Sequence, residues 1–243
     1  MIELKSVSKS FSSQPVLSDL SLQFEEAKTH VLLGSSGCGK STLLRMIIGL
    51  TRPDEGEVHL ETKPLSAYSL FERSQLFGYV IQKFSLFPHF TAFQNVELPA
   101  RCAAWSPQKV KSRIDELSEL VQLEPEMLEK YPFQLSGGQQ QRVSLMRALI
   151  LNPPYLLMDE PLSALDPLIR GDLQEDLLKI FRRLEKTVVF VTHDLREAVK
   201  LGHKIYLLNE GQIVQSGLLE DFQSRPASEF VSRFVQSQRS AAS

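Results

Sequence analysis

Short apolar or alternating runs separated by polar turns mark the first part of the chain and predict strands. We assign strands to 2–7, 20–24, 30–33 and 57–60. Each run is bounded by charged or turn-forming residues, which is typical of strands. Between the third and fourth runs, a glycine-rich turn leads into the helical spacing of 41–48. The chain therefore begins with strands that flank a strand–turn–helix unit.

Helical periodicity replaces this pattern from about residue 90 to residue 153, after one more predicted strand at 78–81. Ser106-Pro107 is a cap and first-turn pair at the start of one helix. Five apolar residues behind it are spaced for one buried helix face: Val110, Ile114, Leu117, Leu120 and Val121. We expect a helical lobe, residues 83–153, inserted into an α/β core.

Strand-like runs return after this region, at 155–158, 188–191 and 205–208. A helix with one apolar face separates the first two runs, and that face consists of Leu173, Leu177, Ile180, Phe181 and Leu184. Alternation of strands and helices predicts a parallel sheet. A turn leads into a last strand at 212–215, and a short helix is expected near 230–235.

Composition limits the possible classes of protein. The 243 residues lie at the upper end of single-domain sizes, and the 42% hydrophobic and 23% charged content is ordinary for a globular protein. With 27 basic and 29 acidic residues, the formal net charge is −2. The chain lacks the basic excess that contacts with nucleic-acid phosphates need, so we expect no nucleic-acid partner.

Cysteine content and apolar run length bear on location. Cys38 and Cys102 are too few for a disulfide framework, which fits a reducing cytosolic compartment. The longest apolar stretches, such as 43–50, are far shorter than the roughly 20 residues of a membrane span. Any membrane role is therefore expected to depend on a partner.

A phosphate-binding loop follows the strand at 30–33. Its sequence is Gly34-Ser-Ser-Gly-Cys-Gly-Lys40-Ser41, placed between a strand and a helix as the pattern requires. Backbone N–H groups of such a loop face phosphates, Lys40 offsets their charge, and Ser41 offers a hydroxyl to Mg²⁺. The expected nucleotide contacts are Gly34, Ser35, Ser36, Gly37, Cys38, Gly39, Lys40, Ser41 and Thr42. The alternatives are a chance Gly/Ser loop and, at Cys38, a redox switch in place of a small tolerated residue.

Two adjacent carboxylates close the apolar run at 155–158. Asp159 is a candidate for holding Mg²⁺ through water, and Glu160 for polarising the water that attacks a γ-phosphate. Neighbouring side chains on a strand point in different directions, so two separate roles are natural. The alternative is a pair of solvated acids in a turn.

A second glycine-containing segment, Leu135-Ser-Gly-Gly-Gln139, continues as Gln-Gln-Arg-Val into a helix. With the phosphate loop and the acidic pair, it makes the chain resemble the ATP-binding cassette (ABC) ATPases over residues from about 1 to 217. The resemblance implies that this second helix N-terminus presents donors to a γ-phosphate through Ser136, Gly137, Gly138 and Gln139. The alternative is an ordinary Gly-Gly turn before a helix.

The resemblance extends to four further positions. Gln82 matches the family glutamine that senses Mg²⁺ and water, and His193 the switch histidine that contacts the γ-phosphate and orients Glu160. Asp166, at the end of Ser163-Ala-Leu-Asp166, matches the loop linking the two active sites. Phe11 lies where the family places an aromatic ring on adenine. Taken alone, these residues would be a surface glutamine, a structural histidine, a loop acid and a core phenylalanine.

The resemblance implies an α/β fold: a P-loop NTPase core with a parallel sheet, N-terminal antiparallel strands and an inserted helical lobe. Residues 1–217 would form a single ATPase domain, with 1–82 and 154–217 as its core and 218–243 as a short helical tail. In this family, two cassettes pair head to tail and enclose each ATP between the phosphate loop of one copy and the segment 135–139 of the other, which we call the signature segment. A homodimer that is inactive as a monomer, with ATP and Mg²⁺ as cofactors, is therefore expected. Within the phosphate loop, the sequence departs from the family pattern at Ser35, where many relatives have proline or another residue.

The single cassette and the near-neutral charge favour a transporter subunit. The aromatic segment Phe84–Phe93 lies after Gln82, where the family receives a helix of its membrane subunits, so contact is expected around 82–95. The alternative is a hydrophobic loop packed within the lobe. The chain would then bind peripherally to the cytoplasmic face of the membrane, with a solute-binding protein in the same complex.

The sequences of several motifs resemble those of prokaryotic importer subunits for osmoprotectants or quaternary amines such as glycine betaine, choline and carnitine. These motifs include Gly78-Tyr-Val-Ile-Gln82 and Leu86-Phe-Pro-His89, although Phe84-Ser85 departs from the Ile-Gly frequent in that group. Two rivals remain open. One is an ABC ATPase for a polyamine, sugar, lipid or exported compound, and the other is a soluble ATP-dependent regulator without a transport role.

Overall fold

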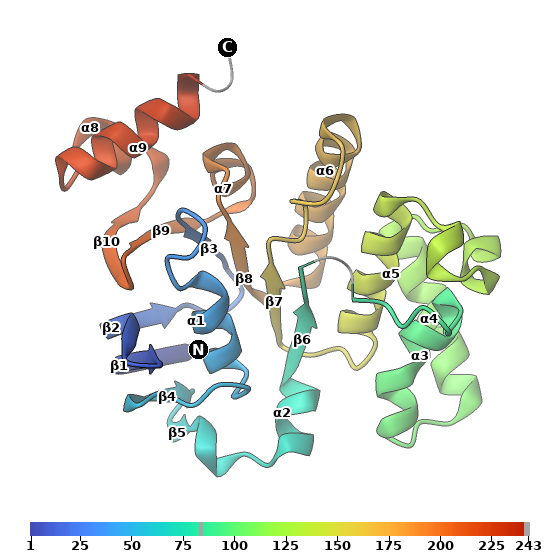
Figure 1. Ribbon diagram of the computed structural model, residues 1–243. Coiled ribbons are helices and arrows are strands. Elements are labelled where there is room, and N and C mark those ends of the chain that lie inside the picture. Colours follow the sequence, from blue (N-terminus) through green and yellow to red (C-terminus); the bar gives the residue numbers. More distant parts are fainter. Residues whose placement is uncertain (83–84, 241–243) are drawn as a thin grey trace. The chain divides into compact units, whose positions relative to one another are not determined.

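The computed structural model describes residues 1–82 and 85–240, which cluster into two compact units (Figure 1). The first unit contains Met1–Arg73 and the segment from Glu185 onward, and the second contains Ser74–Leu184. Lys83 and Phe84 lie outside the described residues, so the first residue of the aromatic segment has no structural account.

The first unit begins with an antiparallel sheet in the order β2-β1-β4-β5. Its strands are β1 (Ile2–Phe11), β2 (Gln14–Phe24), β4 (Glu55–Leu60) and β5 (Lys63–Pro64). The antiparallel N-terminal strands expected from the sequence are confirmed, but β1 and β2 are much longer than the apolar runs. The reason is a tight hairpin at Ser12-Ser13, where both residues have positive φ (48° and 66°). Such turns usually contain Asn-Gly, so this one has no sequence signal.

A mainly parallel arrangement forms the rest of the first unit's β structure. β3 (Thr29–Leu33) pairs in parallel with β8 (Thr187–Thr192) and with β9 (Lys204–Asn209), and β10 (Gln212–Gly217) adds to β9 in the antiparallel sense. Every residue of β3 and β8 is buried, which explains the apolar runs at 31–33 and 188–191.

Helices complete the first unit and its boundary. α1 (Lys40–Ile47) follows β3, and α7 (Leu195–Leu201) follows β8. α8 (Leu219–Ser224) and α9 (Glu229–Ser240) lie against each other near the C-terminus. The short turn η1 (Leu65–Ala67) belongs to the first unit, and the helix α2 (Leu70–Leu76) contains the point in the sequence where the first unit ends and the second begins. The sequence did not predict α2, because none of its residues is buried and it therefore has no apolar stripe.

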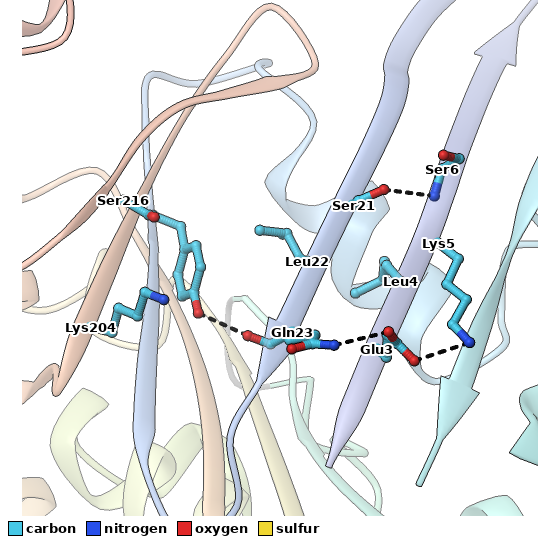
Figure 2. Close-up of a pocket in the computed structure, with 10 residues that line it drawn as sticks. Glu3, Leu4, Lys5, Ser6, Ser21, Leu22, Gln23, Lys204 and Ser216 are labelled. Atoms are coloured by element: carbon cyan, nitrogen blue, oxygen red, sulfur yellow. Dashed lines mark hydrogen bonds and ion pairs between the residues drawn. The ribbon is translucent and has the colours of Figure 1, made fainter. Parts of the chain in front are cut away.

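The two β structures of the first unit meet around an open hollow of about 530 Å³ (Figure 2). The side-chain amide of Gln23 donates to the Glu3 carboxylate on the neighbouring strand at 2.9 Å. Figure 2 marks this hydrogen bond with a dashed line. The Tyr206 hydroxyl on β9 donates to the Gln23 carbonyl at 2.9 Å. Burial raises the pKa of Tyr206 to about 12, so this donor keeps its proton at physiological pH. This bond joins the antiparallel strands to β9.

The second unit combines a parallel strand pair with helices. β6 (Phe77–Val80) pairs with β7 (Tyr155–Asp159) in parallel. The helices are α3 (Ala92–Cys102), α4 (Pro107–Val121), α5 (Gly137–Leu149) and α6 (Pro167–Leu184), with short 3₁₀ turns η2 (Pro125–Glu129) and η3 (Pro132–Gln134). α3, α4 and α5 contact one another. The expected helical region is thus present.

The local helix signals are confirmed in detail. Ser106 caps α4 through its side chain, which accepts from the N–H of Lys109, and Pro107 occupies the first turn. The predicted face of α4 is buried except for the half-buried Leu120, and that of α6 is buried except for the half-buried Leu184. Within 1–82 and 85–240, no helix has the length and apolar character needed to cross a membrane.

Candidate functional site

The phosphate loop curls around a buried lysine in the first unit. Lys40 begins α1 and is only 4% exposed, and its Nζ donates to the carbonyls of Gly34 (2.9 Å) and Ser35 (2.8 Å). Ser35, Ser36 and Gly37 are exposed on the rim of the loop. The loop therefore combines a cation held from inside with backbone open to solvent, which suits a phosphate ligand.

At two positions of the loop, the surrounding atoms leave no room for a side chain larger than that of glycine. A Cβ at Gly34 would lie 2.4 Å from the Leu208 carbonyl oxygen, and one at Gly39 would lie 2.9 Å from that of Val16. Gly39 also has φ +108°, in the region that favours glycine, and as N-cap it leaves the first turn of α1 without a side-chain cap. The start of α1 thus has no capping side chain to compete with a ligand.

The other predicted loop residues follow this geometry. Cys38 is buried at 8% exposure with its Sγ 4.0 Å from the Lys40 Nζ. Ser41 and Thr42 are half-buried in the first turn of α1. A hydroxyl at this turn, a carboxylate such as Asp159 and an amide oxygen such as that of Gln82 are the oxygen ligands that Mg²⁺ prefers.

The second unit brings the acidic pair and the predicted glutamine together. Asp159 ends β7 and is 2% exposed, while Glu160 takes a left-handed conformation with φ 43°. The Gln82 Nε2 lies 3.4 Å from Glu160 Oε2, at hydrogen-bond range. The Tyr79 hydroxyl on β6 lies 3.5 Å from Asp159 Oδ2. The sequence alone did not identify Tyr79, because only the pairing of β6 with β7 brings its hydroxyl close to Asp159.

The loop after Glu160 is closed by its own hydrogen bonds. The Ser163 hydroxyl donates to the Glu160 carbonyl at 2.9 Å, and the Ser163 N–H donates to the same oxygen at 3.2 Å. Asp166 is exposed before α6, and its carbonyl accepts from the N–H of Arg170 at 2.9 Å. The backbone of this loop is therefore fixed while the Asp166 carboxylate faces solvent.

The segment 135–139 forms a capped helix start. Ser136 is the N-cap of α5, and its hydroxyl accepts from the N–H of Gln139 at 3.3 Å. The Gln139 side chain accepts in turn from the N–H of Ser136 at 2.9 Å, which completes a capping box. Gly138 faces α6, where a Cβ would lie 3.0 Å from the Ile169 side chain. The predicted helix N-terminus exists, with Ser136 exposed and Gly138 buried in packing.

The remaining predicted residues are accessible. Phe11, at the end of β1, is 50% exposed, with the Lys9 Nζ 5.4 Å from its ring centroid. It is not a core phenylalanine. His193 follows β8 and is exposed, and the next residue, Asp194, caps α7. In the parts of the chain that the structure describes, no group of three or more His, Cys, Asp or Glu residues is arranged to hold a metal ion by itself.

A family model described as "ABC transporter" matches residues 17–163, which span the phosphate loop, the signature segment and the acidic pair. The chain belongs to the ABC transporter family. The resemblance seen in its motifs is thus confirmed. Fold and sequence agree with this assignment: the dimeric structure of the ATP-binding cassette MJ0796 bound to ADP and Pi superposes with a TM-score of 0.81 at 36% identity, over 90% of this chain and 99% of that one.

Curated ABC proteins are similar over nearly the whole chain. The glycine betaine uptake system ATP-binding protein YehX of Escherichia coli is 44% identical over 96% of this chain and 76% of its own length. The glycine betaine/carnitine/choline transport ATP-binding protein OpuCA of Bacillus subtilis is 42% identical over 98% of this chain. The match spans only 63% of OpuCA, so this ABC chain corresponds to part of that relative.

Proposed function

We propose that this chain is the ATP-hydrolysing subunit of an importer for quaternary-amine osmoprotectants such as glycine betaine, choline or carnitine. One observation supports this most strongly: a complete set of nucleotide-binding motifs occurs in a chain 44% identical, over 96% of its length, to a glycine betaine uptake ATP-binding protein. The proposal covers the activity, the substrate class and the partners. The boundaries of the ATPase domain, 1–217, and of its lobe, 83–153, are part of the same proposal.

Residues 34–42 bind the phosphates of ATP and Phe11 stacks on its adenine ring. Lys40 neutralises the β- and γ-phosphates. Its hydrogen bonds to the carbonyls of Gly34 and Ser35 hold the ammonium group in place before the nucleotide binds. The exposed ring of Phe11 offers a flat apolar surface, with a lysine beside it. Mg²⁺, when bound, would be held by Ser41, Gln82 and Asp159 and would offset phosphate charge.

Glu160 acts as the general base that polarises the attacking water. Its backbone is in the left-handed conformation, and the amide of Gln82 contacts its carboxylate. Strained conformations of this kind concentrate at functional sites. Gln82 and His193 orient Glu160 and the γ-phosphate, in keeping with the family pattern.

Two copies of the chain complete each nucleotide site. The capped N-terminus of α5 presents Ser136, Gly137, Gly138 and Gln139 to the ATP held by the phosphate loop of the other copy, and Asp166 links the two sites. The dimeric state of the cassette MJ0796 supports this arrangement. ATP binding then favours the closed dimer, and hydrolysis releases it.

Separate membrane subunits receive this motion. The described part of the aromatic segment, 85–93, has an irregular backbone until α3 begins at Ala92, and Phe87, Pro88 and His89 are exposed. An exposed aromatic surface of this kind suits an apolar helix of a membrane protein. The chain would be a peripheral subunit on the cytoplasmic face, in a complex that also contains a solute-binding protein.

Replacing Glu160 by Gln tests the catalytic assignment. The amide keeps the shape of the side chain but cannot accept a proton, so we expect ATP turnover to fall by about 10²–10⁴-fold, the range for a lost general base. ATP binding should persist, and ATP should trap the variant as a dimer in size-exclusion chromatography. Glu119→Gln, an exposed carboxylate of α4, is the matched control and should leave turnover unchanged. Wild-type turnover in Glu160→Gln would contradict the assignment.

A further inference from the structure

Asn95 is a fully buried amide in the first turn of α3, with its side chain bonded to the loop that precedes the helix. It is 0% exposed, and its Oδ1 accepts from the N–H of Phe87 at 2.8 Å. Its Nδ2 donates to the carbonyls of Phe87 (3.1 Å), Phe90 (3.2 Å) and Thr91 (3.0 Å). One side chain therefore fixes both ends of the loop 87–91.

The chemistry of these contacts specifies an amide of this length. One backbone donor and several backbone acceptors meet at the same point, so the side chain must both accept and donate. A carboxylate would face three carbonyl oxygens, and an aliphatic residue would leave the buried polar groups without this partner. The loop also has a turn bond from the Phe90 N–H to the Phe87 carbonyl (3.1 Å), and Thr91 caps α3; the Asn95 side chain adds the contacts that tie these two parts of the loop together.

The outer side of the same loop is aromatic and exposed. Phe87 is 41% exposed, and its ring centroid lies 6.1 Å from that of His89 and 5.6 Å from that of Phe90. The Arg147 guanidinium lies 6.0 Å from the Phe87 ring centroid, and its NH1 donates to the Ser85 carbonyl at 2.9 Å. Polar bonds on the inside thus set the orientation of rings on the outside.

The C-terminal end of the loop is tied to the segment before the signature. The N–H of Ala92 donates to the Lys130 carbonyl at 2.8 Å. Lys130 leads through the turn η3 to Ser136. A loop held by Asn95 therefore keeps a fixed connection to the start of α5 within the second unit.

We propose that Asn95 is a positioning residue that holds the loop 87–91 in the conformation bound by the membrane subunit. The inference rests on the proposed function, because it assumes that this loop is the docking surface. Asn95 itself is buried and touches neither nucleotide nor partner. Its loss is expected to weaken the partner complex and to leave ATP binding unchanged.

The test compares Asn95→Ala with the wild-type chain in two binding assays. Affinity for the purified membrane subunits in nanodiscs should fall by about tenfold or more, as expected when several buried hydrogen bonds no longer order the docking loop. ATP affinity of the isolated subunit should stay within about twofold, a change worth under 0.5 kcal/mol. Val96→Ala, a fully buried neighbour in the same helix, is the matched control and should bind the membrane subunits normally.

Two further readouts separate positioning from a general loss of stability. Asn95→Leu keeps a similar branched shape without the hydrogen bonds, so it should weaken partner binding even if Asn95→Ala folds poorly. If Asn95 acts through the aromatic surface, its effect and that of Phe87→Ala should be strongly non-additive in a double-mutant cycle. Normal partner affinity in both Asn95 variants, or full additivity, would overturn the inference alone. Failure of the wild-type chain to bind its membrane subunits would contradict the proposed function, and the inference with it.

Discussion

His30 is a buried histidine enclosed by aromatic rings and backbone at the start of β3. It is 0% exposed, its ring lies 5.2 Å from that of Phe24, and its Nε2 is 2.9 Å from the Glu25 carbonyl. Burial lowers the pKa of His30, and the opposing effect of the Glu25 carbonyl is smaller. The buried imidazole makes this part of the first unit sensitive to acid.

The sign of the pH effect follows from proton binding. Because the pKa of His30 is lowered by folding, the unfolded chain binds a proton at this histidine more readily than the folded chain as the pH falls through its ordinary pKa of about 6.5. The free energy of unfolding should therefore decrease as the pH falls from 7.5 to 5.5. His30→Phe removes this group, so the decrease should be shallower in the variant. Urea unfolding at both pH values measures it, and equal decreases in the two proteins would contradict the account.

Individual residues also show what the sequence alone could determine. The motifs placed the phosphate loop, Gln82 and the acidic pair, because their chemistry depends on residue type and spacing. They did not reveal Tyr79 beside Asp159 or Asn95 beneath the loop 87–91, since both contacts arise from packing between segments. An asparagine inside an amphipathic helix was the one weak signal for Asn95. The roles assigned to the site residues stay predictions.

Elements were predicted well where one face is buried and poorly where it is not. β3, β7 and β8 followed from continuous apolar runs, and α4 from its cap and stripe. α2 has no buried residue, and the β1–β2 hairpin turns at two serines, so neither had a pattern to detect. Local sequence thus predicts an element where burial of a face imposes a pattern of apolar residues, and it fails where no face is buried.

An ion pair joins two of these elements in the second unit. The NH2 of Arg142 on α5 lies 2.5 Å from Asp176 Oδ2 on α6, and the two side chains are 19% and 13% exposed. Arg142 NH1 also donates to the Val121 carbonyl at the end of α4. One guanidinium therefore connects α4, α5 and α6.

Removing this guanidinium should be costly. Arg142→Met leaves Asp176 without its closest cation in a largely buried place, so we expect the free energy of unfolding to fall by about 2–3 kcal/mol. Arg225→Met is the matched control, because its pair with Asp221 is exposed (82% and 37%) and should contribute about 1 kcal/mol or less. Chemical denaturation measures both variants. Equal small losses would show that the pair behaves like a surface contact.

At the scale of the whole molecule, the site residues are divided between two compact units. Phe11, the phosphate loop and His193 belong to the first, and Gln82, the signature segment, the acidic pair and Asp166 belong to the second. The proposed cycle also requires a second copy of the chain and a membrane subunit. The family is established by similarity over nearly the whole chain, while in the proposed function the transported solute would be set by the membrane and solute-binding subunits.

The most direct test of the central claim is solute-stimulated ATP hydrolysis by the assembled complex. The chain would be purified with its membrane subunits, reconstituted in nanodiscs, and assayed with the solute-binding protein and glycine betaine, choline, carnitine or spermidine. We expect one or more quaternary amines to raise the ATPase rate several-fold, spermidine to have no effect, and Glu160→Gln to abolish the response. Two results would contradict the proposed function. One is stimulation by spermidine and by none of the quaternary amines, and the other is a chain that hydrolyses ATP but does not bind any membrane subunit.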